Sequence, residues 1–275
     1  MTGVFIPGGK VATLPYTGER MVPELASQET VWEHLYRYKF AMARVVGKAV
    51  LDIACGEGYG TRALVEAGAG SVVGVDISEE VCAHARFKYG LDTRVGRAET
   101  IPLPSGSLDA VVSFETIEHI ERPESFLSEA ARVLRPRGLL IISTPNQAVY
   151  GSAYANPFHC SEMNREQFLG VISRRFTTAR LYGQCSRHPP TLSPRLLSSL
   201  GARYAVAKPL SWLRRAFSFP YQLRAIEKAR ASTPEVIIGR ESALSRFLNP
   251  YVVRPEISSE YCSPKYYVAL CHKDC

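Results

Sequence analysis

The sequence predicts an α/β fold in which a largely parallel sheet carries helices on both faces. Short apolar runs alternate with segments of helical spacing between residues 49 and 144, which is the pattern of strand–helix–strand units. The first run ends in a glycine cluster, and the second ends at an aspartate, Asp76. A helix between two consecutive strands forms a right-handed crossover connection, and strands joined in this way lie parallel.

The expected elements follow one another regularly along the chain. The opening, punctuated by glycine and proline as far as Pro23, should be an arm, and a helix should run over 28–46. Strands are expected at 49–54, 71–78, 93–98, 108–114, 139–144, 177–184 and 266–272. The helices between them carry end signals, namely Gly90 at a C-terminus, Pro123 at a first turn and a capping-box pair, Asn164 and Gln167.

Composition fits one globular domain with an elaboration. The chain has 275 residues, of which 46% are hydrophobic and 21% charged. No apolar run is long enough for a membrane-spanning helix, and the opening does not resemble a secretory signal, so a cytoplasmic location is expected. The seven cysteines are scattered and include no CxxC pair, which argues against a disulfide framework and against a zinc knuckle.

The strongest chemical signal is the segment LDIACGEGYG, residues 51–60. A buried strand carries Asp52 near its end and runs into a GxGxG turn, where glycine lets a ligand lie against bare main chain. The next strand ends at Asp76, whose carboxylate can accept both hydroxyls of a ribose. Nicotinamide- and flavin-binding folds share these features, but they carry GxGxxG and lack the preceding aspartate.

This segment resembles the first motif of class I S-adenosylmethionine-dependent methyltransferases. The resemblance continues through VVGVDIS, RAETIPLPSGSLDAVVSFETIEHI and ARVLRPRGLLIISTPN, and covers roughly residues 46–146. It implies a Rossmann-like seven-stranded methyltransferase sheet with helices on both faces and an antiparallel last strand. It also implies that S-adenosylmethionine is the cofactor, bound by Asp52, Gly56, Gly58, Gly60, Asp76, Ile77, Ala98, Glu99 and Phe114.

Within that set, Asp52 would hold the methionine amino group, Asp76 the ribose diol, and Ala98 with Glu99 the adenine. Upstream, YTGERMVPE and WEHLYRYKFA resemble bacterial methyltransferases of sugars, polysaccharides and secondary metabolites. That resemblance implies that Arg37 pairs with the methionine carboxylate and that Tyr38 closes the pocket. The alternative is that both are ordinary surface and core positions of a helix.

The expected domain organisation has three parts. Residues 1–45 form an N-terminal arm and a cofactor-covering helix, 46–185 and 264–275 form the core, and 186–263, hereafter the insert, form a helical lid that binds the acceptor. Between Arg187 and Arg246 eleven Lys or Arg stand against three Glu. This basic character suits a phosphate-bearing or nucleotide-linked sugar, a glycan at a membrane surface, or RNA. A solvated helical surface and a homodimer interface are the alternatives.

Two histidines are candidates for a general base. His119 lies in FETIEHI just past the fourth strand, and His159 lies in NPFHCSEM beyond the fifth. Both should reach the carboxyl edge of the sheet, where open α/β folds bind ligands. Removing a hydroxyl proton is the task that methyl transfer leaves to the protein, and imidazole suits it. In many methyltransferases, however, the Glu-His pair only shapes a loop.

Four residues together resemble the metal ligands of Hen-type small-RNA 2′-O-methyltransferases: Glu115, Glu118, His119 and His159. That resemblance implies Mg²⁺ or Mn²⁺ on a ribose diol, although many metal-free relatives keep most of these residues. The favoured function is O-methylation of a hydroxyl on a saccharide or glycosylated natural product. The alternatives are Hen-like RNA ribose 2′-O-methylation, N-methylation of an amino sugar, and a cofactor-binding partner subunit without catalysis.

Overall fold

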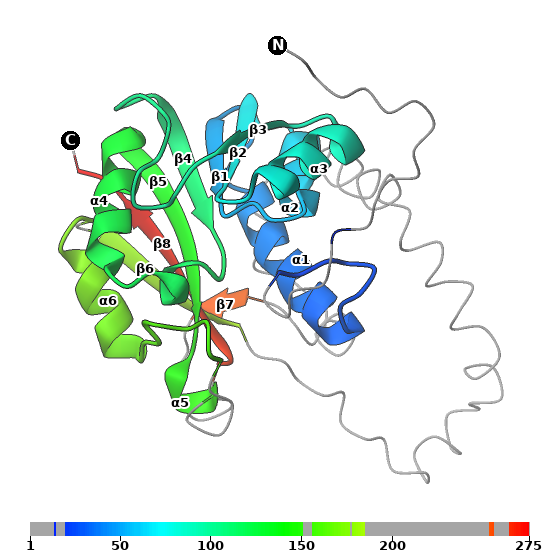
Figure 1. Cartoon of the computed structure of the whole chain (residues 1–275). Helices are drawn as coiled ribbons and strands as arrows, with labels where there is room; N and C mark the ends of the chain where they lie inside the picture. The colour runs from blue at the N-terminus through cyan, green and yellow to red at the C-terminus, as the bar shows by residue number, and fades with distance from the viewer. Residues whose placement is uncertain are drawn as a thin grey trace, which may run out of the picture. The chain divides into compact units, whose positions relative to one another are not determined.

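The computed structural model describes residues 14, 20–150, 156–176, 178–184, 253–255 and 264–274. Within them the α/β fold is confirmed. One sheet has the strand order β3-β2-β1-β4-β5-β8-β6-β7 (Figure 1). Apart from β7 (Val253–Pro255), the insert expected to form a lid lies outside the described residues.

The seven expected strands are all present. They are β1 Ala49–Ile53, β2 Ser71–Asp76, β3 Asp92–Val95, β4 Leu108–Ser113, β5 Leu134–Pro145, β6 Thr178–Gln184 and β8 Tyr266–His272. The first five pair in parallel, whereas β8 is antiparallel to both β5 and β6, as the resemblance implied. The eighth strand, β7, pairs antiparallel with the end of β6. Three residues are too few to show strand periodicity in a sequence.

The described helices are α1 Gln28–Met42, α2 Tyr59–Glu66, α3 Glu79–Tyr89, the 3₁₀ turn η1 Ile117–His119, α4 Pro123–Val133, α5 Gln147–Tyr150 and α6 Arg165–Ser173. Local chemistry explains their ends. The Asn164–Gln167 pair forms the expected capping box at α6, and Gly90 ends α3 with φ +66°. Helix α1 ends at Met42, earlier than expected. The helix α5 and the turn η1 were not expected.

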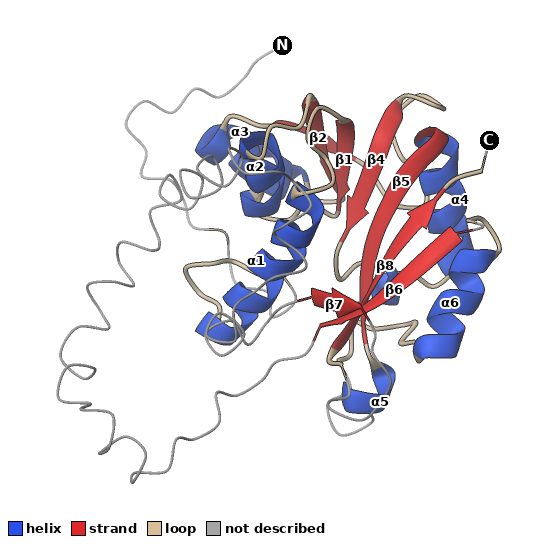
Figure 2. Cartoon of the chain, turned by 180° about the vertical axis from the view of Figure 1, so that it is seen from behind, coloured by secondary structure: helices blue, strands red, loops and turns tan. Residues whose placement is uncertain are grey.

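Two hydrophobic clusters cover the two faces of the sheet. On one face, α4 and α6 pack Phe126, Leu127 and Phe168 against inward residues of the strands. On the other face, α1 and α2 contribute residues such as Val31 and Leu64. Adjacent strand residues divide between the two clusters, because side chains alternate across a sheet. Figure 2 shows α1 to α3 on one side of the sheet and α4 with α6 on the other.

The carboxyl ends of β1, β2, β4 and β5 meet at one edge of the sheet, because these strands are parallel. The loops that follow them carry the predicted site residues, and α1 lies across the same region (Figure 1). No helix among the described residues is long and apolar enough to cross a membrane.

Candidate functional site

The three glycines of the loop after β1 play different structural parts. Gly56 has φ +55°, and an added Cβ would have no atom closer than 3.9 Å, so this position faces open space. A Cβ on Gly58 would lie 2.8 Å from Ala85 Cβ on α3, and one on Gly60 would lie 1.9 Å from the Tyr38 ring. All three were predicted to line the cofactor. Gly58 and Gly60 make room for neighbouring elements of the protein, whereas an added Cβ on Gly56 would be in contact with no atom nearer than Arg20 Cγ.

Asp52, at the end of β1, is fully buried behind this loop. Thr61 Oγ1 donates to its Oδ2 at 2.6 Å, and the Tyr38 hydroxyl donates to its two oxygens at 3.1 and 3.2 Å. Burial raises the pKa of Asp52 to about 7, although these hydrogen bonds oppose the rise. Burial therefore disfavours the ionised carboxylate, and a cation bound nearby would favour it.

Asp76, at the end of β2, orients the glycine loop. Its Oδ2 accepts from the backbone N–H of Gly56 at 2.9 Å, and its Oδ1 accepts from that of Ser78 at 3.0 Å. A carboxylate oxygen can accept a second hydrogen bond, so Asp76 retains capacity for ligand hydroxyls. The next residue, Ile77, is 60% exposed, which leaves an apolar surface beside the carboxylate.

The other predicted cofactor residues border the same edge. Ala98 follows β3 and packs on the core, while the side chain of Glu99 forms an ion pair with Arg97 at 3.9 Å. Phe114 directly follows β4, and its ring lies nearly perpendicular to that of Tyr38 at a centroid distance of 5.0 Å. Tyr38 is only 5% exposed, and its ring packs beneath the glycine loop that follows β1.

Arg37 is fully buried, which rules out the alternative that it is a surface position. Its Nη1 donates to Gln184 Oε1 at 2.7 Å, and its guanidinium lies over the Tyr266 ring, 4.3 Å from the centroid. Glu115 Oε1 lies 4.0 Å from Nε. Among the described residues, Nε and Nη2 have no hydrogen-bond partner. A buried cation with two unsatisfied donors is costly unless an anion completes the site.

Sequence reasoning missed Glu57, the residue between Gly56 and Gly58. It is 1% exposed and accepts hydrogen bonds from Tyr89 at 2.7 Å and from Lys88. His84 Nε2 lies 3.1 Å from the same carboxylate. These three partners lie on α3, so Glu57 fastens the glycine loop to that helix. The sequence signal that could have identified Glu57 is its charge, because its neighbours in the loop, Gly56 and Gly58, are glycines.

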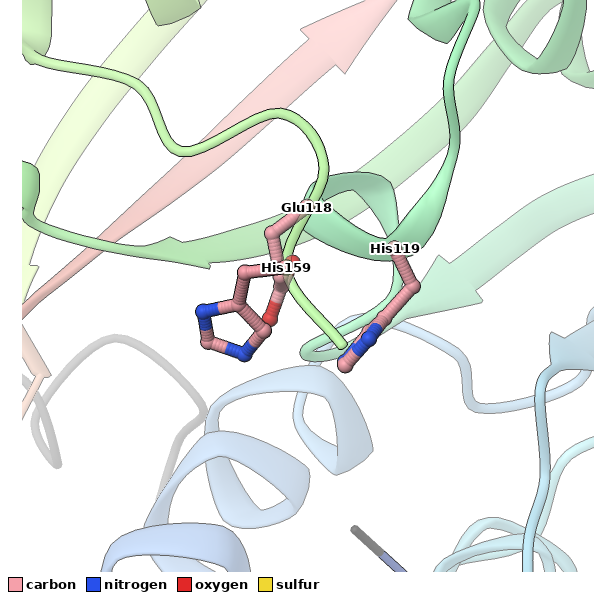
Figure 3. Close-up of side chains that lie close together, drawn as sticks. All are labelled: Glu118, His119 and His159. Carbon is pink, nitrogen blue, oxygen red and sulfur yellow. The ribbon is translucent and has the colours of Figure 1, made fainter. Parts of the chain in front are cut away.

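Three of the four proposed metal ligands come together. Ligand atoms of Glu118, His119 and His159 lie within 4.8 Å of one another, and Figure 3 shows the three side chains close together. Glu118 is fully buried, and neither of its carboxylate oxygens has a partner among the described residues. Burial and the charge of Glu115 raise the pKa of Glu118 well above its usual range. The fourth residue, Glu115, is outside this group and accepts from Ser143 Oγ at 2.6 Å.

His159 is held by two side chains that sequence reasoning missed. Its Nδ1 lies 2.9 Å from Glu162 Oε1, and its Nε2 lies 3.0 Å from Asn156 Nδ2. The carboxylate can only accept, so Nδ1 carries the proton and Nε2 accepts from the amide. Glu162 and Asn156 stand three residues on either side of His159, which was the available sequence signal. The His119 and His159 rings meet edge to face at 4.8 Å.

Comparison with known proteins agrees with this geometry. Residues 51–142 match the family model described as a methyltransferase domain. A probable S-adenosylmethionine-dependent methyltransferase of Mycolicibacterium smegmatis is 41% identical over 167 residues, which cover 58% of this chain and 64% of that protein. The chain therefore spans somewhat less than two thirds of this relative.

Two further matches are more distant. A ubiquinone biosynthesis O-methyltransferase of Parvibaculum lavamentivorans is 34% identical over 110 residues, which cover 38% of this chain and 43% of that protein. A solved methyltransferase of Thermotoga maritima, described as a possible histamine N-methyltransferase, shares the fold with a TM-score of 0.56 at 17% identity, covering 89% and 92% of the two chains. Residues 51–142 thus match a methyltransferase domain, and the chain shares the class I methyltransferase fold and is similar over 58% of its length to a probable S-adenosylmethionine-dependent methyltransferase.

Proposed function

We propose that the protein binds S-adenosylmethionine at the carboxyl edge of the sheet and transfers its methyl group to a hydroxyl of a saccharide or glycosylated natural product. The observation that carries this proposal is Arg37, a buried guanidinium with two donors unsatisfied among the described residues. The methionine carboxylate of the cofactor is the anion that would complete it.

The remaining cofactor groups also find complementary partners. Gly56 offers open space, and Asp76 keeps acceptor capacity for the two ribose hydroxyls. Asp52 supplies a buried negative charge for the methionine ammonium. The exposed side chain of Ile77 would pack on the adenine ring. Each of these four residues thus lies where a charged, polar or apolar part of the cofactor would bind.

The acceptor would lie beside Phe114 and the imidazole of His159. Methyl transfer forms an oxygen–carbon bond as the carbon–sulfur bond breaks, and the hydroxyl proton must leave. His159 Nε2 would accept that proton, with Nδ1 held by Glu162. The acceptor hydroxyl would replace the Asn156 amide as the partner of Nε2. Glu162 would then stabilise the imidazolium.

Oxygen as the acceptor atom agrees with the related ubiquinone biosynthesis O-methyltransferase. It also agrees with the carboxylate of Glu162 beside His159, because polyols donate hydrogen bonds to carboxylates. We propose that the insert, residues 186–263, supplies further acceptor contacts, and that its basic residues favour phosphate-bearing acceptors.

A second candidate function is metal-dependent ribose 2′-O-methylation. The grouping of Glu118, His119 and His159 favours it, together with the unpartnered carboxylate oxygens of Glu118. These oxygen and imidazole donors suit Mg²⁺ or Mn²⁺, which would acidify a bound hydroxyl. The bonds of Glu115 to Ser143 and of His159 to Asn156 weigh against it.

The test is methyl transfer from labelled S-adenosylmethionine to panels of nucleotide sugars, glycosylated natural products and short RNAs, each with and without a chelator. We expect chelator-insensitive labelling of a saccharide hydroxyl, located by mass spectrometry of the product. Chelator-sensitive labelling of RNA would favour the second candidate, and labelling of an amine would overturn the hydroxyl assignment. Absence of cofactor binding in calorimetry would overturn the proposal as a whole.

A further inference from the structure

Gln184, the last residue of β6, bridges two turns of α1. It is fully buried. Its side-chain oxygen accepts from Arg37 Nη1 at 2.7 Å, and its side-chain nitrogen donates to the backbone carbonyl of Glu33 at 2.9 Å. Both ends of the amide are therefore used, and the bond to Glu33 fixes which end faces Arg37.

The position of Gln184 leaves the Nε–Nη2 edge of the Arg37 guanidinium without a hydrogen bond among the described residues, and the Glu115 carboxylate approaches it no closer than 4.0 Å. A guanidinium can grip a carboxylate through two parallel N–H donors. Nε and Nη2 form such a pair on one edge, and these two atoms are the donors without a partner among the described residues. Gln184 occupies Nη1 instead. The Gln184 amide thus binds Nη1, which is not one of the two donors, Nε and Nη2, that would bind a carboxylate.

Tyr266, the first residue of β8, fixes the plane of the same group. Its ring lies under the guanidinium at 4.3 Å, and its hydroxyl donates to Glu33 Oε2 at 2.9 Å. Lys265 Nζ lies 3.0 Å from Glu33 Oε1. Glu33 therefore ties α1 to the start of β8, and Gln184 ties it to the end of β6, which is the neighbouring strand of the sheet (Figure 2). Arg37 contacts one residue of each strand.

We propose that Gln184 and Tyr266 are positioning residues that aim the Nε and Nη2 donors of Arg37 at the methionine carboxylate. This inference rests on the proposed function, because it takes the cofactor as the anion. A flexible arginine would lose side-chain entropy on gripping the ligand, whereas one held at Nη1 and stacked on a ring is already ordered. Affinity for the carboxylate should therefore depend on two residues that do not touch it.

The test compares two ligands that differ only in the carboxylate, S-adenosylmethionine and decarboxylated S-adenosylmethionine, by titration calorimetry on the full chain. Gln184→Met removes both hydrogen bonds and keeps the length of the side chain. We expect it to weaken S-adenosylmethionine binding about tenfold and to change binding of the decarboxylated ligand less than about twofold. Gln147→Met, at an exposed position of α5, is the matched control and should change neither.

Tyr266 provides a second and independent pair of variants. Tyr266→Leu loses the ring and should weaken S-adenosylmethionine about threefold with the decarboxylated ligand little affected. Tyr266→Phe keeps the ring and should retain this discrimination between the ligands. These variants keep the inference testable if Gln184→Met does not fold, which thermal unfolding would reveal.

Arg37→Met separates this inference from the proposed function. If Arg37→Met lowers affinity only for the carboxylate-bearing ligand, the cofactor assignment stands. If in addition Gln184→Met and Tyr266→Leu both leave this selectivity intact, or weaken both ligands equally, the positioning role is wrong. If Arg37→Met itself is unselective, the placement of the methionine carboxylate is wrong.

Discussion

The ring of Tyr38 occupies the space that a side chain at position 60 would need. A Cβ on Gly60 would lie 1.9 Å from Tyr38 Cζ, and the Tyr38 hydroxyl reaches past this point to Asp52. The absence of one side chain on α2 therefore allows α1 to place a hydrogen-bond donor on the buried carboxylate.

Gly60→Ala should displace Tyr38 and remove the hydrogen bond to Asp52. We expect a loss of about 2–4 kcal/mol in the free energy of unfolding, since overpacking adds to a broken buried bond. Gly170→Ala is the control, because its Cβ would meet nothing within 4 Å in α6, and it should stabilise by about 0.5–1 kcal/mol. Urea denaturation measures both, and equal effects would contradict the packing account.

Asp76→Ala should weaken S-adenosylmethionine binding by about 1–3 kcal/mol, because the ribose hydroxyls lose a charged acceptor and the Gly56 and Ser78 N–H groups lose theirs. Calorimetry measures the change. Asp92→Ala is the control, since Asp92 is exposed and pairs only weakly with Arg94 at 3.4 Å. Unchanged affinity in Asp76→Ala would remove Asp76 from the cofactor site.

Cofactor affinity should rise with pH through the titration of Asp52. Burial raises its pKa to about 7, against the Tyr38 and Thr61 hydrogen bonds and with the charge of Asp76 adding to the rise. The ionised form attracts the methionine ammonium, so affinity should increase roughly tenfold between about pH 5.5 and about pH 7.5. Calorimetry across this range checks it, and Asp52→Asn should flatten the profile.

The raised pKa of Asp52 should lower the stability of the ligand-free protein as the pH rises, whereas it should raise cofactor affinity. An acid whose folded pKa exceeds its unfolded value favours folding while it is protonated. This contribution is lost as the pH rises from about 4 to about 7. Without ligand, the difference in unfolding free energy between wild type and Asp52→Asn should change across this window. A constant difference would mean that Asp52 is not protonated in the folded protein.

Glu57→Ala should destabilise the protein by about 2–4 kcal/mol, because Tyr89 and His84 lose their buried acceptor and Lys88 keeps only its ion pair with Glu24. Glu79→Ala is the matched control. Glu79 also pairs with a cation on α3, Arg86, but its side chain is 69% exposed, and exposed pairs contribute little. Thermal unfolding compares the two variants, and a similar small effect in both would show that Glu57 does not fasten the loop.

His159→Ala should lower kcat by a factor of about 10²–10⁴ with cofactor affinity retained, because the acceptor hydroxyl loses its base. Glu162→Gln removes the carboxylate that holds Nδ1 and should lower kcat by a smaller factor. Steady-state kinetics on the identified acceptor measures both. Normal turnover by His159→Ala would move the base elsewhere or point to an amine acceptor.

The sequence predicted where seven strands lie along the chain, because apolar periodicity and glycine position are local signals. It did not reveal which glycines make room for neighbouring elements. Gly58 and Gly60 look alike in sequence, yet their missing side chains make room for Ala85 of α3 and Tyr38 of α1. Those neighbours come from elsewhere in the chain, so only the packed structure identifies them.

The sequence likewise could not reveal the roles of Gln184 and Glu57. Each is polar and buried, and its partners lie on other elements, Arg37 for one and Lys88 for the other. Glu115 has φ +52° and leans toward Ser143 rather than toward the Glu118 cluster. An ExxEH spacing brings its two glutamates and its histidine together only if the backbone is regular, and at Glu115 it is not.

The pairing of Gln184 with Tyr266 brings together the end of β6 and the start of β8, although the insert separates them in the sequence. Their register is antiparallel, and the backbone N–H of Lys265 donates to the carbonyl of Gln184 at 2.8 Å. Such adjacent strand ends can be joined by a two-residue turn as readily as by a long segment. Evolution can thus exchange or resize what stands between them without rebuilding the sheet. This junction is therefore a place where a segment of another length could be inserted while β6 and β8 keep their register.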